Sequence, residues 1–193
     1  YYHIYSRTIF NIPEFKDKKN ADKLLQSFIL ANSTNSSKAF EYLRNNTNSK
    51  IEKAIEILQE GDKLVDVLCY SIMPDHYHLL LCEKKENGIS EFVRKSNISI
   101  SKYINIKYKR KGPLFESRFN SKHIKDNRYL LHLSVYIHLN PLDILCGKEW
   151  REHKLESWNN EKNKLLKYHW SSLKLFLNES HKFLVNYFGP ERI

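Results

Sequence analysis

LVDVLCYSIMPDHYHLLLCE, residues 64–83, consists of two apolar segments separated by a short proline-containing turn at 73–75. Two such segments around a turn are typical of a β-hairpin. Side chains two positions apart in a strand project from the same face, so His76 and His78 point one way and Tyr77 the other. The sequence therefore predicts a hairpin whose second strand carries two imidazoles on one face.

The two imidazoles are candidate ligands for one divalent ion. Neighbouring side chains on one strand face start roughly 6–7 Å apart, which allows both rings to reach a shared ion. The three leucines at 79–81 predict a central strand that would hold such a site rigidly. The pattern alone is weak, and two polar histidines on a half-exposed strand remain the alternative.

Composition indicates a folded, basic domain. Hydrophobic residues make up 41% of the 193 residues and aromatic residues 13%, which excludes a disordered chain. The formal net charge of +10 favours a polyanionic partner, nucleic acid first and an anionic membrane surface second.

Nothing in the sequence suggests secretion or a membrane span. No apolar run approaches the roughly 18 residues of a spanning helix, and the opening YYHIYSRTIF does not resemble a signal peptide. The three cysteines, Cys69, Cys82 and Cys146, lack metal-ligand spacing and indicate reduced thiols. We therefore expect a cytoplasmic protein with no membrane partner.

The rest of the chain alternates strand-like and helix-like segments. Residues 1–10 alternate as a strand does, with His3, Tyr5 and Arg7 on one face. Periodicity predicts an extended strand at 114–124 and helices at 20–32, 38–45, 48–61, 89–109 and 127–139. In the partly helical tail that follows, Trp170 to Leu173 start one helix. This order predicts an α+β domain with one antiparallel sheet and helices on one of its faces.

The predicted helix 127–139 places Tyr136 and Asn140 four residues apart and hence on one face, with His132 one turn earlier. A packed aromatic with its hydroxyl at the surface is the alternative for Tyr136. An ordinary helix end is the alternative for Asn140, because the residue before Pro141 disfavours the helical conformation.

Together, these groups suit one reaction, the attack of a tyrosine on a phosphate. A tyrosine hydroxyl beside a divalent ion that neutralises a phosphate can attack phosphorus and form a covalent intermediate. Nitrogens of His76 and His78 with the side-chain oxygen of Asn140 suit such an ion, and Mg²⁺ or Mn²⁺ is the occupant expected. Tyr136 would then be the nucleophile.

Several stretches jointly resemble a known family: YSIMPDHYHLLL (70–81), KYKRKGPLFESRFNSKHI (107–124), DNRYLLHLSVYIHLNPL (126–142) and YHWSSL (168–173). Their order and spacing are similar to those of the repeat-associated (REP-associated) tyrosine transposases. These belong to the single-tyrosine branch of the HUH (His, hydrophobic, His) endonucleases. The opening YYHIYSRT also looks like that family's first strand, so the resemblance covers residues 1–8 and about 64–175.

The resemblance implies a ferredoxin-like (RRM-like) antiparallel sheet with the histidines on a central strand and the nucleophile on a following helix. It maps the metal ligands onto His76, His78 and Asn140 and the nucleophile onto Tyr136. Members cut single-stranded DNA next to a hairpin, leave a 5′-phosphotyrosine and a free 3′-OH, and can rejoin strands. The expected cofactor is Mg²⁺ or Mn²⁺, the expected partner hairpin DNA, and the expected assembly a nucleoid-associated monomer or homodimer.

Two features depart from the family pattern. Tyr77 occupies the middle position between the histidines, where an aliphatic residue is usual. Residues 10–47 do not match the short first connection of the family and are expected to be a helical insertion. We expect a transposase domain at 1–147 and a helical C-terminal extension, packed on it, at 148–193.

Basic and aromatic side chains near the end of the predicted helix 89–109 are candidate DNA contacts, because such segments bind phosphates and stack bases. The candidates are Lys107, Tyr108, Lys109, Arg110 and Lys111, with Arg118 and Lys122 further along. A solvated, charged helix end is the alternative for each of them.

Two other functions stay open. A catalytically silent module on the same sheet would bind DNA or RNA hairpins by shape and charge. Such a module has no physical need for the intact set of His76, His78 and Tyr136. An RNA-processing nuclease is the weaker alternative, because covalent tyrosine chemistry requires no 2′-OH.

Overall fold

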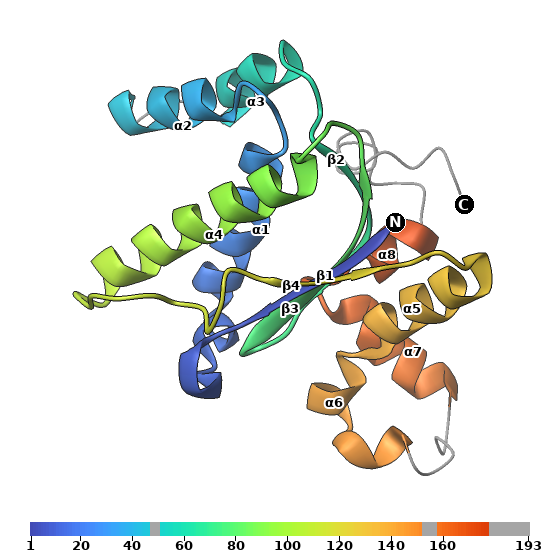
Figure 1. Cartoon of the computed structure of the whole chain (residues 1–193). Helices are drawn as coiled ribbons and strands as arrows, with labels where there is room; N and C mark the ends of the chain where they lie inside the picture. Colours follow the sequence, from blue (N-terminus) through green and yellow to red (C-terminus); the bar gives the residue numbers. More distant parts are fainter. Residues whose placement is uncertain (47–50, 152–157, 178–193) are drawn as a thin grey trace.

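The computed structural model describes residues 1–46, 51–151 and 158–177 (Figure 1). Its strands are β1 (Tyr2–Arg7), β2 (Val65–Ile72), β3 (His76–Glu83) and β4 (Asn120–His123). Its α-helices are α1 (Lys18–Ala31), α2 (Ser36–Asn45), α3 (Ile51–Gln59), α4 (Gly88–Lys107), α5 (Asn127–Leu139), α6 (Leu142–Leu145), α7 (Trp158–Lys167) and α8 (Leu173–Leu177). Short 3-10 turns are η1 (Ile9–Asn11), η2 (Glu14–Lys16) and η3 (Lys148–Arg151).

The four strands form one sheet in the order β2-β3-β1-β4, and every neighbouring pair is antiparallel. Helices connect β1 to β2 and β3 to β4, whereas β2 and β3 form the predicted hairpin. This is the ferredoxin-like order, so the α+β fold class expected from the sequence is confirmed.

One face of the sheet packs against α1 and α4, which lie side by side over it (Figure 1). Strand β3 contributes Tyr77, Leu79 and Leu81 to this main core, all fully buried. Phe28 of α1 and Phe92 of α4 close over them. Alternation along β3 thus sends its apolar side chains into the main core and its histidines to the opposite face.

The opposite face carries α5 (Figure 1). The sequence predicted helices on one face; α1 and α4 form that layer, and α5 adds a second. A β-bulge between Val67 and Cys69 reverses the alternation of β2, so that Cys69 joins Leu80 on this side. Leu133 and Ile137 of α5 cover these two residues and make a small second core.

Within residues 10–47, predicted as a helical insertion, α1 serves as the crossover helix that packs on α4. Helix α2 instead pairs with α3 away from the sheet, around Leu30, Ala39 and Leu58 (Figure 1). The predicted start of the third helix at Asn48 lies outside the described residues.

The predicted strand at 114–124 is shorter than expected. Only Asn120–His123 pair with β1, because Leu114 and Phe115 turn into the main core instead. Phe115 makes a single bridge to Thr8.

Residues 168–172 extend along the outer edge of β2. The amide of Ile72 donates to the Trp170 carbonyl at 2.8 Å, and the amide of Ser172 donates to the Tyr70 carbonyl at 3.0 Å. The helix predicted to start at Trp170 therefore begins at Leu173, after this edge segment.

Among the helices that the structure describes, none has both the length and the apolar character that a membrane crossing requires.

We expect Tyr77→Phe to lower the free energy of unfolding by about 1–3 kcal/mol, because it leaves a buried acceptor without its donor. The Tyr77 hydroxyl donates to Asn97 Oδ1 at 2.8 Å, and both side chains are buried. Urea denaturation followed by circular dichroism measures the change. Tyr103→Phe is the matched control, since Tyr103 is partly buried and its hydroxyl makes no hydrogen bond to the described residues. Equal effects of the two substitutions would contradict the prediction.

Candidate active site

A cavity of about 1070 Å³ lies between the histidine-bearing face of the sheet and α5. Its walls include His76 and His78 from β3 and Tyr136 from α5, together with Asn140 directly after that helix. The four residues predicted from the sequence to act together therefore line one cavity. The rest of its wall comes chiefly from β1, the turn before β3, and residues that follow α5.

Strand β1 supplies a second row of polar side chains to this cavity. Its register pairs Tyr5 with His78 and Arg7 with His76, so the odd-numbered residues of β1 share the histidine face. His3 Nε2 lies 3.0 Å from His78 Nδ1, at hydrogen-bonding distance. The alternation of residues 1–10 predicted that these residues lie on one face of their strand, but neither that the histidines of β3 share this face nor that the two rings are in contact.

The carboxylate of Asp75 orients His76. His76 Nδ1 donates to Asp75 Oδ1 at 2.6 Å, and Arg7 Nε lies 3.8 Å from the other carboxylate oxygen. Burial raises the pKa of Asp75, but the hydrogen bond and the charges of His76 and Arg7 outweigh it and hold that pKa below its ordinary value. When His76 is neutral, its proton lies on Nδ1 and Nε2 keeps a free lone pair.

His78 and His3 are neutral rings. Burial, with a smaller effect of repulsion from His76, His3 and Arg7 in their protonated forms, lowers the pKa of His78 to about 2. Burial and the charge of Lys122 lower the pKa of His3 to about 4. When His78 Nδ1 donates to His3 Nε2, the Nε2 atom of His78 also keeps a free lone pair.

Local sequence places Tyr136 beside His78. Helix α5 begins after Asp126, whose carboxylate accepts from the Arg128 amide at 2.9 Å. Its buried side at Ile137 fixes the rotation of the helix against the sheet. Tyr136, one position earlier, is left 39% exposed, and its ring meets that of His78 edge-on at 5.7 Å between centroids.

Arg151 joins the site from η3. Its Nη2 donates to Asn140 Oδ1 at 3.2 Å, and its guanidinium carbon lies 5.5 Å from the centroid of the Tyr136 ring. Asp143 holds the guanidinium in place through a 2.9 Å ion pair. The Nδ2 atom of Asn140 is buried without a hydrogen-bond partner among the described residues.

The side chains present fit a divalent ion. The His76 and His78 rings lie 5.0 Å apart between centroids, and each has its Nδ1 engaged by a neighbour and its Nε2 available. Engagement of the second ring nitrogen is what fixes the orientation of metal-binding histidines. The carboxamide oxygen of Asn140 accepts one hydrogen bond and has a second lone pair. No group of three or more His, Cys, Asp or Glu side chains suited to a metal occurs in the described part of the chain. Beside the two imidazoles, the Asn140 carboxamide would offer an oxygen donor.

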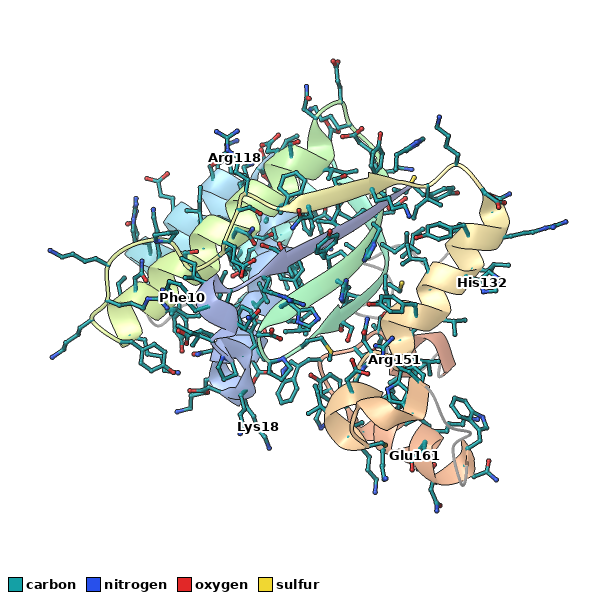
Figure 2. All side chains as sticks on the ribbon, turned by 60° about the horizontal axis from the view of Figure 1, so that its bottom comes forward. Phe10, Lys18, Arg118, His132, Arg151 and Glu161 are labelled. Atoms are coloured by element: carbon teal, nitrogen blue, oxygen red, sulfur yellow. The ribbon has the colours of Figure 1, made fainter. Side chains whose placement is uncertain are left out.

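The predicted DNA contacts fall into separate places. Lys122 lines the cavity with the histidines, whereas Arg118 lies on the α4 side of the sheet, away from His132 and Arg151 (Figure 2). Lys109 and Lys111 are exposed beyond the end of α4.

The other three candidates connect α4 to the start of α1. Lys107 Nζ lies 2.7 Å from Asp17 Oδ2, and the Tyr108 hydroxyl lies 3.2 Å from the same atom. Arg110 pairs with Glu14 at 2.8 Å. These contacts give the three basic and aromatic side chains a structural role, which is to hold the end of α4 against the start of α1.

Sequence reasoning missed four residues of the site, of which only Asp75 belongs to the hairpin. They are His3, Arg7, Asp75 and Arg151, and each of them contacts a predicted site residue or its neighbour. A signal existed for Asp75, which directly precedes His76, and for the polar face of β1. None existed for Arg151, because only the fold brings η3 to Tyr136.

Comparison with known proteins places the chain in a family. The model of the family described as "Transposase IS200 like" matches residues 34–140, which is more than half of the chain. The chain therefore belongs to the IS200-like transposases. A comparison with curated proteins finds no significant match.

A solved structure supports the fold. It is that of a REP-associated tyrosine transposase bound to a REP hairpin, at 10% sequence identity and a TM-score of 0.53. The match covers 91% of this chain and 78% of the other. The family predicted from the sequence motifs is thus confirmed, and the structural match covers more of the chain than the residues matched by the family model.

We expect Ser172→Ala to lower the free energy of unfolding by about 1–3 kcal/mol, because it removes a buried bond between α5 and the edge segment. Ser172 Oγ lies 2.8 Å from His138 Nε2 and 2.9 Å from the Tyr70 amide nitrogen. Ser134→Ala on the exposed side of α5 is the control and should change stability by less than about 0.5 kcal/mol. Thermal and urea unfolding measure both, and an unchanged midpoint in Ser172→Ala would refute this account.

Proposed function

We propose that this chain is a metal-dependent single-strand DNA endonuclease and strand transferase that cuts next to DNA hairpins. The observation that carries the proposal is the position of Tyr136, whose ring contacts His78 within one cavity. Membership of a transposase family supports DNA as the substrate. The structural relative, which is bound to a REP hairpin, supports hairpin DNA as the partner.

Tyr136 is the proposed nucleophile. Its Oη attacks the scissile phosphorus, an Oη–P bond forms, and the bond from phosphorus to the 3′ oxygen breaks. The phenolic proton is lost, and the departing 3′ oxygen gains a proton to become a free hydroxyl. The 5′ phosphate stays on Tyr136 as a phosphotyrosine, which a 3′-OH can attack in the reverse direction to join strands.

His76, His78 and Asn140 are the proposed ligands of a divalent ion, Mg²⁺ or Mn²⁺. When bound, such an ion would neutralise the phosphate and stabilise the charge that develops on it. Asp75 and His3 would fix the orientation of the two imidazoles through their Nδ1 atoms. Arg151, over the Tyr136 ring, is placed to pair with a phosphate oxygen through its guanidinium.

Lys122 is the basic side chain best placed to contact DNA at the cavity, since it lines the same wall as the histidines. Lys109 and Lys111 remain candidate phosphate contacts on exposed surface. Lys107, Tyr108 and Arg110 are proposed only as indirect contributors, because their side chains hold α4 against the segment that precedes α1.

The tyrosine is proposed to act within its own chain. Only three residues, 124–126, separate β4 from α5, and the first of them, Ile124, is buried in the second core. Leu133, Ile137 and the bond from His138 to Ser172 then fix α5 on its own sheet. A monomer therefore contains every group that the proposed reaction requires.

Tyr136→Phe is expected to abolish a covalent protein–DNA adduct, because the substitution removes the attacking oxygen. The measurement is a denaturing gel of the protein mixed with labelled hairpin DNA carrying single-stranded flanks, with Mn²⁺ or with chelator. Tyr129→Phe is the matched control, since Tyr129 also lies on α5, lines the cavity and is 39% exposed. It should form the adduct at a rate within about tenfold of the unsubstituted protein.

An adduct that persists in Tyr136→Phe would show that another residue is the nucleophile. Absence of any adduct, with retained binding of the hairpin, would instead favour the catalytically silent binding module. A 2′-deoxy substrate that resists cleavage while its RNA equivalent is cut would favour the RNA-processing nuclease.

His76→Ala is expected to weaken Mn²⁺ binding more than about tenfold, because it deletes a ligand. Isothermal titration of the DNA-free protein with Mn²⁺ measures this without any dependence on catalysis. His132→Ala is the control: His132 lines the same cavity from α5 but is exposed and has no proposed metal role. Unchanged Mn²⁺ affinity in His76→Ala would remove the histidine pair from the metal site, whatever the result of the adduct assay.

A further inference from the structure

A second groove, of about 890 Å³, runs between the outer side of α4 and residues 113–119. It lies on the α4 side of the sheet, so it is separate from the cavity that contains the histidines and Tyr136 (Figure 2). Its wall contains Arg118, a predicted DNA contact.

The groove is basic. Arg94 and Lys102 lie two helical turns apart on one side of α4, and Arg118 faces them from the opposite wall. All three side chains are exposed, and none has an ion-pair partner among the described residues. The groove has no Asp or Glu in its wall. Three cations line the groove and no acidic side chain does, which makes the groove complementary to a phosphate chain.

The groove also has apolar and amide surface between its cations. Ile98 of α4 is 42% exposed, and Phe119 on the facing wall is partly buried. Asn105 Oδ1, also in the groove wall, is buried without a hydrogen-bond partner among the described residues. Apolar and aromatic surface beside cations suits unstacked bases, whereas the paired bases within a hairpin stem are stacked on one another and do not expose their faces.

The wall that bears Arg118 is attached rigidly to the strand of the proposed metal ligands. The backbone carbonyl of Arg118 accepts from Asn97 Nδ2 at 3.1 Å, and Asn97 Oδ1 accepts from the Tyr77 hydroxyl at 2.8 Å. Tyr77 lies between His76 and His78. Tyr77 stands where the family usually has an aliphatic residue, and its hydroxyl, through Asn97, connects the groove wall to the strand that lines the cavity.

An edge of the sheet lies between the two sites. Among the described residues, no strand pairs with the outer side of β4, and all four of its residues are exposed. Strand β4 begins two residues after Arg118 and carries Lys122, which lines the cavity. A DNA strand that leaves the cavity over β4 thus meets basic side chains on both sides of the edge.

We propose that this groove binds single-stranded DNA that flanks the cleaved position, with Arg94, Lys102 and Arg118 contacting its phosphates. The inference rests on the proposed function, because it assigns the groove to the same DNA that Tyr136 cuts.

The test compares hairpin DNA with and without a single-stranded dT tail of about 10 nucleotides at one end or the other. Fluorescence anisotropy at several salt concentrations gives the affinity of the chain and of the triple variant Arg94→Gln, Lys102→Gln and Arg118→Gln. The tail should increase the affinity of the unsubstituted chain. The triple variant should lose about 10- to 100-fold in affinity for tailed DNA, and its salt slope should fall by about 2.

The matched control is Lys38→Gln, Arg44→Gln and Lys53→Gln on the α2–α3 pair, three exposed cations whose removal changes the net charge equally. Equal losses in the two triple variants would overturn the proposal in favour of general charge. An equal loss for DNA without a tail would overturn it in favour of the hairpin stem.

Two further measurements complete the test. A tail that contains 5-iodouracil should crosslink to Phe119 or its neighbours on ultraviolet irradiation, and crosslinks confined to other segments would overturn the proposal. At saturating DNA, the triple variant should still form the Tyr136 adduct. If the unsubstituted chain forms no adduct but shows the tail-dependent binding, the proposed function fails while the groove assignment holds.

Discussion

The pairing of β3 between β1 and β2 is the constraint on which the rest of the structure depends. Because β3 is an inner strand, its alternating side chains place apolar residues on one face of the sheet and histidines on the other. Tyr77 and its apolar neighbours build the main core, and His76 and His78 face α5. A shift of register by one residue would exchange the two sets, burying imidazoles in the main core. The register of β3 that stabilises the fold therefore also determines where the histidines lie.

The sequence predicts much of this arrangement, for identifiable reasons. The hairpin at 64–83, the alternation of β1 and the i, i+4 relation of Tyr136 and Asn140 follow from local geometry, which the order of residues determines directly. The joint motif pattern identifies the family. What local pattern could not give is the contact of His3 with His78, or the arrival of Arg151 at Tyr136, because both depend on segments far apart in the chain.

Charge was the least informative part of the sequence. Lys107 and Arg110 stand in a basic run that resembles a phosphate-binding segment, yet both pair with acidic side chains near the start of α1. Arg94 and Lys102, which carry no such signal in the sequence, face a groove without acids. Whether a basic side chain is paired with an acid or available to a ligand depends on its neighbours in space, and packing determines those neighbours.

The edge segment at 168–172 can pair with β2 only after the rest of the sheet has been synthesised. A chain emerges from the ribosome N-terminus first, so the whole sheet and Tyr136 are synthesised before the residues that cover β2. Until then β2 keeps an open edge and His138 lacks its bond to Ser172. Full anchoring of α5 thus waits until residues 168–172 have been translated, and a chain terminated before them would carry the histidines without a firmly held Tyr136.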